Sequence, residues 1–214
     1  YTHAAGLPAV LDFGFARAAI DAVSGTKGTD QFARLFDGDA LYKGGAGAAL
    51  GLPTFLGNHD MGRFAMFVKQ ANPGASEAEL LQRVMLGHAM LLTLRGVPTI
   101  YYGDEQGFVS DDKDQLARED MFASKVAAYN DNELIGSDAT TTTANFDTAH
   151  PLYRHIAALS EIRRKTPALM RGATKVRAFS DKPGLLAVSR FDPDTGREVL
   201  LAFNTSAAPL AAHI

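Results

Sequence analysis

The segment from Gly51 to Phe64 constrains the fold of this chain more than any other. A short apolar run, residues 54–56, lies between a proline and a glycine, and this pattern predicts a buried β-strand. An amide, an imidazole, a carboxylate and a guanidinium follow it directly, on Asn58, His59, Asp60 and Arg63. A buried strand that delivers such a set at its carboxyl end is typical of the active-site edge of an α/β barrel.

A second segment, from Arg95 to Glu105, has the same pattern. Pro98 stands near its start, β-branched and aromatic residues follow, and Gly103 precedes two acids. The chain is therefore expected to contain two buried parallel strands, each ending in polar residues.

These two segments carry a family resemblance. The sequence from Phe55 to Asp60, with Arg63 and Phe64, resembles the seventh-strand motif of the α-amylase family of glycoside hydrolases. The sequence from Gly96 to Glu105 is similar to the eighth-strand motif, and the two stand in the family order about forty residues apart. The resemblance implies an α/β fold: the C-terminal portion of a (β/α)8 TIM barrel, followed by part of an antiparallel β domain.

The expected helices and a later change in hydrophobic period divide the chain into two parts. Helices are expected near residues 15–23 and 31–36, over 76–94 with a Ser76–Glu79 capping box, and over 150–165. The last helix is expected to bury its apolar residues, which are Leu152, Ile156, Leu159 and Ile162. From residue 174 the pattern alternates with period two, and a turn at 192–196 separates two strands. We therefore predict a barrel portion over residues 1–172 and a β-sandwich portion over 173–214.

The resemblance also assigns roles to the polar residues. The family cleaves α-glucosidic bonds with retention, which uses a carboxylate nucleophile and a carboxylic acid about 5–5.5 Å apart. A third carboxylate stands on the seventh strand, and Asp60 matches it as the catalytic residue that would hydrogen-bond the sugar at the cleavage subsite. Arg63 would orient this acid through a charge-assisted bond. The expected substrate-binding residues are His59, Asn58, Arg63 and Tyr102.

No carboxylate of this chain matches the family's nucleophile or general acid, whose strands would lie upstream of Tyr1. We therefore expect a fragment that acts on no glucan by itself, and that associates with a copy of itself or with the missing barrel half. No cofactor is expected in this chain, and a calcium site, common in the family, would use upstream residues. The expected ligand of the parent enzyme is an α-glucan or oligosaccharide.

The composition gives no indication of nucleic-acid binding or of a membrane span. The net charge is −3, without a basic excess that would indicate nucleic acid, and no stretch of about 18 apolar residues suggests a membrane span. Cysteine is absent, which leaves the redox compartment open. The Gly- and Ala-rich sequence is typical of a high-GC bacterial source. The compartment stays undetermined, and a periplasmic or extracellular location is compatible with the composition.

Two other classes of protein fit these residues less well. A non-catalytic binding or scaffold protein with the amylase fold has no chemical reason to keep the polar cluster after the first strand. A metal phosphohydrolase would need His59 and Asp60 on a helix with further ligands. The glycines of 45–51 are expected in a flexible loop, the acids of 111–132 in a solvated loop, and residues 138–147 in a linker.

Overall fold

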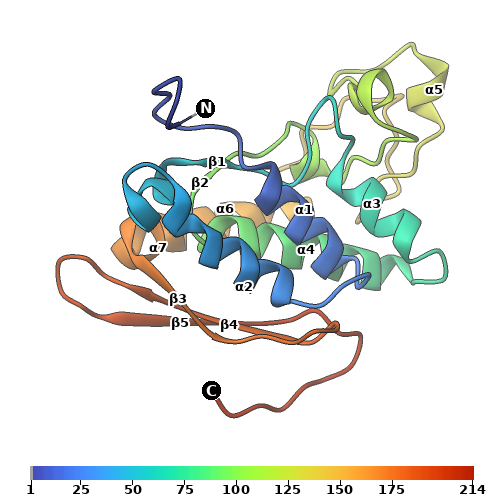
Figure 1. Cartoon of the computed structure of the whole chain (residues 1–214). Coiled ribbons are helices and arrows are strands. Elements are labelled where there is room, and N and C mark those ends of the chain that lie inside the picture. Colours follow the sequence, from blue (N-terminus) through green and yellow to red (C-terminus); the bar gives the residue numbers. More distant parts are fainter. Residues whose placement is uncertain (1) are drawn as a thin grey trace.

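The computed structural model describes residues 2–214, which form helices between two small sheets (Figure 1). The helices and strands are α1 (Phe13–Val23), α2 (Asp30–Asp37), β1 (Pro53–Thr54), α3 (Phe64–Ala71), α4 (Glu77–Thr93), β2 (Val97–Pro98), α5 (Ala127–Asn130), α6 (Pro151–Lys165), α7 (Pro167–Arg171), β3 (Ala173–Ala178), β4 (Leu185–Phe191) and β5 (Glu198–Asn204). No helix within residues 2–214 has the length and apolar character needed to cross a bilayer.

The first sheet holds the two expected parallel strands, although each is only two residues long. The expected burial is wrong for β2, because Val97 is exposed and Pro98 is half-buried. Pro53 lies opposite Val97, and the N–H groups of Val97 and Thr99 donate across the pair at 2.8 Å each. The polar segments that follow β1 and β2 therefore leave the sheet at the same end. This geometry, with helices packed against one side, is that of a partial α/β barrel.

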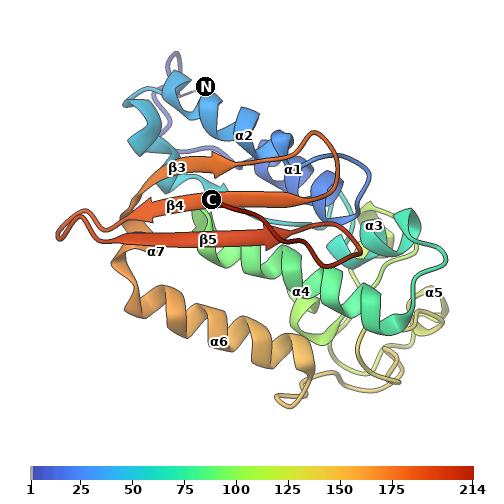
Figure 2. The same ribbon diagram turned by 90° about the horizontal axis from the view of Figure 1, so that it is seen from below.

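The second sheet is antiparallel, in the order β3-β4-β5. It includes the hairpin expected around residues 192–196. Figure 2 shows the three strands side by side, with α2 next to β3 and α7 next to β5. Leu186 and Val188 of β4 are fully buried in the core that the sheet shares with the helices. Helix α7 ends at Arg171 and β3 begins at Ala173, while the division of the chain into two domains at residue 172 stays a prediction.

Helix α4 forms where its capping box predicts it. Ser76 accepts a hydrogen bond from the Glu79 N–H at 3.2 Å, and Leu80, Val84 and Leu91 are buried. His88 is also buried, and its Nδ1 lies 2.9 Å from the Val84 carbonyl oxygen.

Helix α6 forms at the expected place, and its predicted buried face is correct in part, because Leu152 is buried and Ile156 and Leu159 are half-buried. Ile162 is exposed, whereas the neighbouring Arg163 is buried. The Arg163 guanidinium donates at 3.0 Å to the carbonyl of Leu92, in the last turn of α4, and at 2.7 Å to that of Gly96, just beyond the end of the helix. Satisfying these buried carbonyls requires the arginine on the inner face, because an unpaired backbone acceptor in the core is costly.

Two segments expected as loops have more structure than predicted. Residues 45–51 form a 3₁₀ helix. Residues 107–149 form a compact unit, here called the 107–149 lobe, at the upper right of Figure 1. Inside it, the buried Thr141 hydroxyl donates to the Tyr129 carbonyl at 2.7 Å, and the Asp147 N–H donates to Gln106 at 2.9 Å. The prediction of a solvated loop and a linker was therefore wrong for the buried part of this lobe.

Candidate functional site

The site is built on the turn that follows β1. The Asn58 side-chain oxygen accepts hydrogen bonds from the N–H groups of Asp60 and Met61 at 2.9 and 2.8 Å. Asn58 and Gly62 also pair through their backbones, and Gly62 has φ of +104°, a conformation that favours glycine. The amide of Asn58 therefore shapes the turn, and its expected contact with a sugar stays a prediction.

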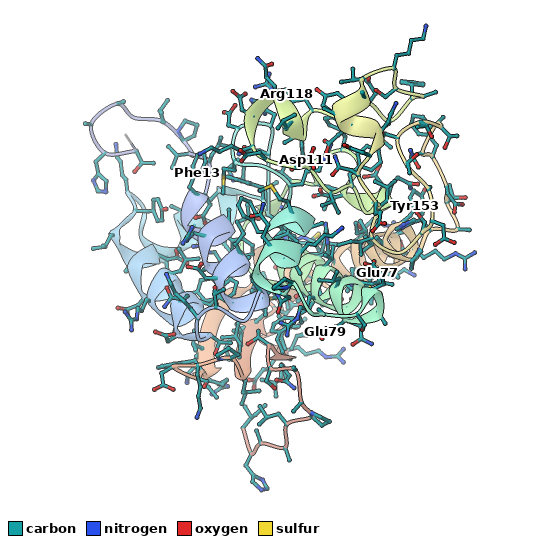
Figure 3. All side chains as sticks on the ribbon, turned by 90° about the vertical axis from the view of Figure 1, so that its right-hand side faces the viewer. Phe13, Glu77, Glu79, Asp111, Arg118 and Tyr153 are labelled. Carbon is teal, nitrogen blue, oxygen red and sulfur yellow. The ribbon has the colours of Figure 1, made fainter. Side chains whose placement is uncertain are left out.

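His59 and Asp60 project from this turn into solvent. Their side chains are 57% and 70% exposed, and His59 Nε2 lies 3.3 Å from Asp60 Oδ1. Arg118 of the 107–149 lobe, at the top of Figure 3, places its Nη2 3.6 Å from the same carboxylate oxygen. The same Nη2 lies 2.6 Å from Asp114. An exposed imidazole, a carboxylate and a guanidinium thus meet in one place.

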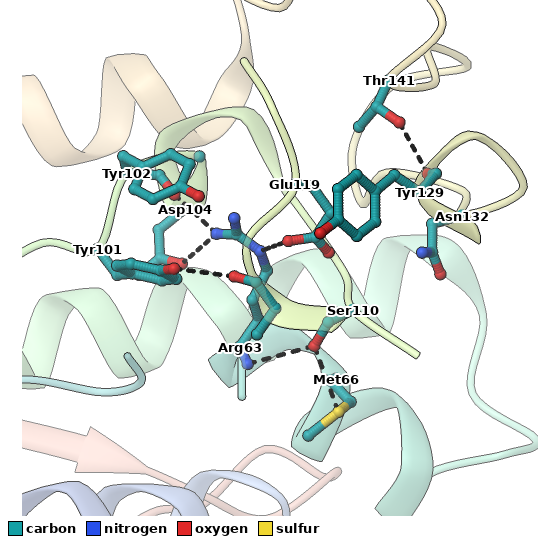
Figure 4. Close-up of polar contacts among 12 residues, drawn as sticks. Arg63, Met66, Tyr101, Tyr102, Asp104, Ser110, Glu119, Tyr129, Asn132 and Thr141 are labelled. Carbon is teal, nitrogen blue, oxygen red and sulfur yellow. Dashed lines mark hydrogen bonds and ion pairs between the residues drawn. The ribbon is translucent and has the colours of Figure 1, made fainter. Parts of the chain in front are cut away.

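Arg63 lies elsewhere, in the interior, with no exposed surface. Its Nε donates to Glu119 at 2.6 Å and its Nη1 donates to the Tyr102 carbonyl at 2.7 Å (Figure 4). The expected bond from Arg63 to Asp60 is absent from its contacts among the described residues, and a fully buried guanidinium cannot touch a sugar. The reason is local, because the chain reverses at Gly62 and enters α3 at Phe64, which turns residue 63 inward.

Aromatic rings surround the Arg63 guanidinium. Its central carbon lies 4.7 Å from the Tyr101 ring centre, 5.1 Å from that of Tyr102 and 4.9 Å from that of Phe108. Such stacking favours the cation. Tyr102 itself is 40% exposed, so one part of its side chain covers Arg63 while another faces solvent. Its expected role in substrate binding stays a prediction.

Glu119 is the site residue that the sequence analysis missed. It is 1% exposed and lies in a segment whose neighbours are charged, so its sequence context indicated a surface loop. Burial raises the pKa of Glu119, and the contact with Arg63 opposes this shift. Residues 118–122 also have a short and weak resemblance to the loop after the eighth strand of the α-amylase family, and this was a sequence signal that could have singled out Glu119.

The arrangement can bind a polyhydroxylated ligand. Exposed carboxylate, imidazole and guanidinium groups together accept and donate hydrogen bonds to neighbouring hydroxyls. No group of three or more His, Cys, Asp or Glu residues is placed to hold a metal ion within residues 2–214.

A parallel strand pair with polar side chains at its carboxyl end and an antiparallel sheet after it are features of an α/β barrel protein with a C-terminal β domain. The family model for the alpha amylase catalytic domain matches residues 1–172. The chain belongs to the α-amylase family.

Its relatives include enzymes of two kinds. It is 43% identical to an alpha-amylase of Streptomyces lividans over 206 residues, which cover 96% of this chain and 22% of that protein. It is 32% identical to a cyclomaltodextrin glucanotransferase of Paenibacillus macerans over 155 residues, or 72% of this chain and 17% of that protein. The chain thus spans about a fifth of the length of these relatives.

Solved structures show the same fold. An Anoxybacillus alpha-amylase superimposes with a TM-score of 0.69 and 22% identity, over 94% of this chain and 37% of that one. A gamma-type cyclodextrin glucanotransferase from alkalophilic Bacillus clarkii matches with a TM-score of 0.66 and 25% identity, over 93% of this chain and 24% of that one. The expected fold class, a TIM-barrel portion followed by part of a β domain, is confirmed.

Proposed function

We propose that this chain supplies the sugar-holding carboxylate of a retaining α-glycosidase that acts on α-linked glucosides such as maltooligosaccharides. The observation that carries the proposal is the exposed Asp60 beside His59 and Arg118, at the carboxyl end of β1. A carboxylate there would accept hydrogen bonds from ring hydroxyls and favour the distorted, oxocarbenium-like transition state. Such hydrogen bonds contribute up to several kcal/mol in glycosidases.

The general acid and the nucleophile are proposed to come from residues outside these 214. A glycosidase acid keeps its proton because it is buried in apolar surroundings. Asp60 and Asp114 are both exposed and share the cation of Arg118, a setting suited to holding a sugar. Glu119 is buried, and one of its carboxylate oxygens accepts a hydrogen bond from Arg63, so we do not propose it as the general acid. Any calcium of the whole enzyme is likewise proposed to be bound by residues outside these 214.

The open flanks of the small parallel sheet support a proposal about partners. Leu7, Leu11 and Phe13 are exposed on the β1 side, around a hollow of about 690 Å³. Val97 and Tyr153 are exposed on the β2 side. Apolar residues exposed beside such a short sheet favour association. We propose that the rest of a barrel covers these flanks, and that copies of the chain cover them when the chain is alone.

Binding of maltopentaose, followed by ligand-observed NMR and calorimetry, tests the proposal without requiring turnover. We expect the chain to bind the sugar and Asp60→Asn to bind it about tenfold more weakly, because a charged acceptor is lost. Asp112→Asn, which removes a nearby exposed carboxylate, should retain the affinity. Equal binding by Asp60→Asn and the unmodified chain would contradict the role of Asp60 and favour a non-catalytic amylase-fold protein that binds elsewhere.

A further inference from the structure

Two ion pairs join the same two segments of the chain, one inside the molecule and one at its surface. Inside, Arg63 Nε donates to Glu119 Oε2 at 2.6 Å. At the surface, Arg118 Nη2 lies 3.6 Å from Asp60 Oδ1. Glu119 directly follows Arg118 in the chain, and Asp60 and Arg63 are the two ends of one turn. The buried pair and the surface pair therefore lie next to each other along both segments, and Arg118 Nη2 also lies 2.6 Å from Asp114.

The buried pair has no evident value as a simple stabiliser. Removing two charges from water costs about as much free energy as their attraction returns, and apolar residues of similar size are often as stable. Here Glu119 Oε1 and Arg63 Nη2 are also buried without a hydrogen-bond partner among the described residues, which adds to the cost. A costly pair at this place is better explained by the geometry that it enforces.

Further bonds hold each half of the pair. The Arg63 N–H donates to the Ser110 hydroxyl at 3.4 Å, and Arg63 Nη1 donates to the Tyr102 carbonyl (Figure 4). On the other side, the Tyr101 hydroxyl donates to the Ala117 carbonyl at 2.8 Å, next to Arg118. Arg63 thus links the turn after β1, the end of β2 and the 107–149 lobe.

We propose that Arg63 and Glu119 are positioning residues, whose buried ion pair sets the place of Arg118 against Asp60 and so the direction of the Asp60 carboxylate. The inference rests on the proposed function of Asp60 in sugar binding. In this proposal Arg63 acts by arranging the residues around Asp60 and does not contact the sugar itself. Arg118 is the residue of the 107–149 lobe that contacts Asp60 in the turn after β1.

Amide hydrogen exchange of the free chain provides the first test. The N–H groups of Asp60, Met61 and Gly62 are bonded within the turn and report on it. In Glu119→Gln we expect these amides to exchange at least about tenfold faster, because the charge-assisted bond is lost. Amides of the β4–β5 ladder should keep their rates. A role in global stability alone would accelerate both sets together and would overturn the proposal.

Maltopentaose affinity provides the second test. Arg118→Gln and Glu119→Gln should weaken binding to a similar extent, and the double variant should be no weaker than either, because both changes remove the same constraint. Glu133→Gln, an exposed glutamate of the same lobe paired with Lys69, is the matched control and should bind normally. Unchanged affinity in Glu119→Gln beside a loss in Arg118→Gln would overturn the proposal.

The two proposals fail in different ways. If the unmodified chain binds no maltopentaose, the proposed function fails, and the exchange rates alone decide the positioning role. If Glu119→Gln does not fold, Glu119→Asp replaces it, because it keeps the charge and withdraws the carboxylate by one methylene. That variant should accelerate exchange in the turn about threefold, and equal acceleration in the β4–β5 ladder would contradict positioning.

Discussion

Two histidines at helix α6 bind backbone atoms in the interior. His150 Nδ1 accepts from the Leu152 N–H at 3.2 Å and caps the helix, and His155 Nε2 lies 2.9 Å from the Met85 carbonyl oxygen. Burial lowers the pKa of both side chains below the usual value. The unfolded chain therefore takes up protons first as the pH falls, so the contribution of both histidines to stability is present above their ordinary pKa and is lost below it.

His150→Asn isolates this effect at one residue. Asparagine is a good helix N-cap and does not titrate, so the cap is retained while the protonation is removed. We expect the melting temperature of the unmodified chain to fall between about pH 7.5 and pH 5.5, and to fall less in His150→Asn. Exposed His3→Asn serves as the control. An equal fall in the unmodified chain and in His150→Asn would contradict the account.

At the scale of elements, α3 and α4 touch through a glycine. A Cβ at Gly87 would lie 2.3 Å from Phe64 Cε1, and Phe64 is fully buried. Gly87→Ala should therefore destabilise the chain by about 1–3 kcal/mol in urea unfolding, although alanine favours a helix. Gly74→Ala, where nothing lies within 4 Å, should be close to neutral. A stabilised Gly87→Ala would show that the two helices separate easily.

A helix could be predicted from the sequence only where the residues that determine it lie within the helix itself. Ser76 and the apolar spacing of α4 lie within one helix, so the sequence sufficed to place it. Helix α3 was missed because it is only eight residues long and begins with a continuous apolar run from Phe64 to Val68, which does not by itself distinguish a helix from a strand. The inward face of α6 depends on carbonyls near residues 92–96, which no pattern within the helix can indicate.

At the scale of the whole molecule, buried charges join distant segments. Arg95 Nε donates to Asp39 at 2.6 Å, and its Nη1 contacts Asp12, the residue that caps α1. The candidate site also contains buried charges that join distant segments, because Arg63 and Glu119 form an ion pair although they are 56 positions apart in the chain. The family motif was sufficient to single out Asp60, but the partner of Arg63 was not predictable, because it depends on the path of the 107–149 lobe.

The exposed flanks of the parallel sheet predict association of the chain in isolation. Sedimentation should detect species larger than a monomer, and Leu11→Lys with Val97→Lys should reduce them, because a charge placed on each flank opposes burial. Leu210→Lys, which alters an exposed leucine of the C-terminal tail, should leave the association unchanged. A well-folded monomer of the unmodified chain would contradict this proposal.

Hydrolysis of a chromogenic maltooligosaccharide by this polypeptide, with Asp60→Asn beside it, tests the central claim most directly. The claim is that the chain holds the sugar-binding carboxylate while the acid and the nucleophile lie outside its 214 residues. It predicts no turnover by either protein. Turnover by the unmodified chain that disappears in Asp60→Asn would contradict it, because both catalytic carboxylates would then have to lie within this chain.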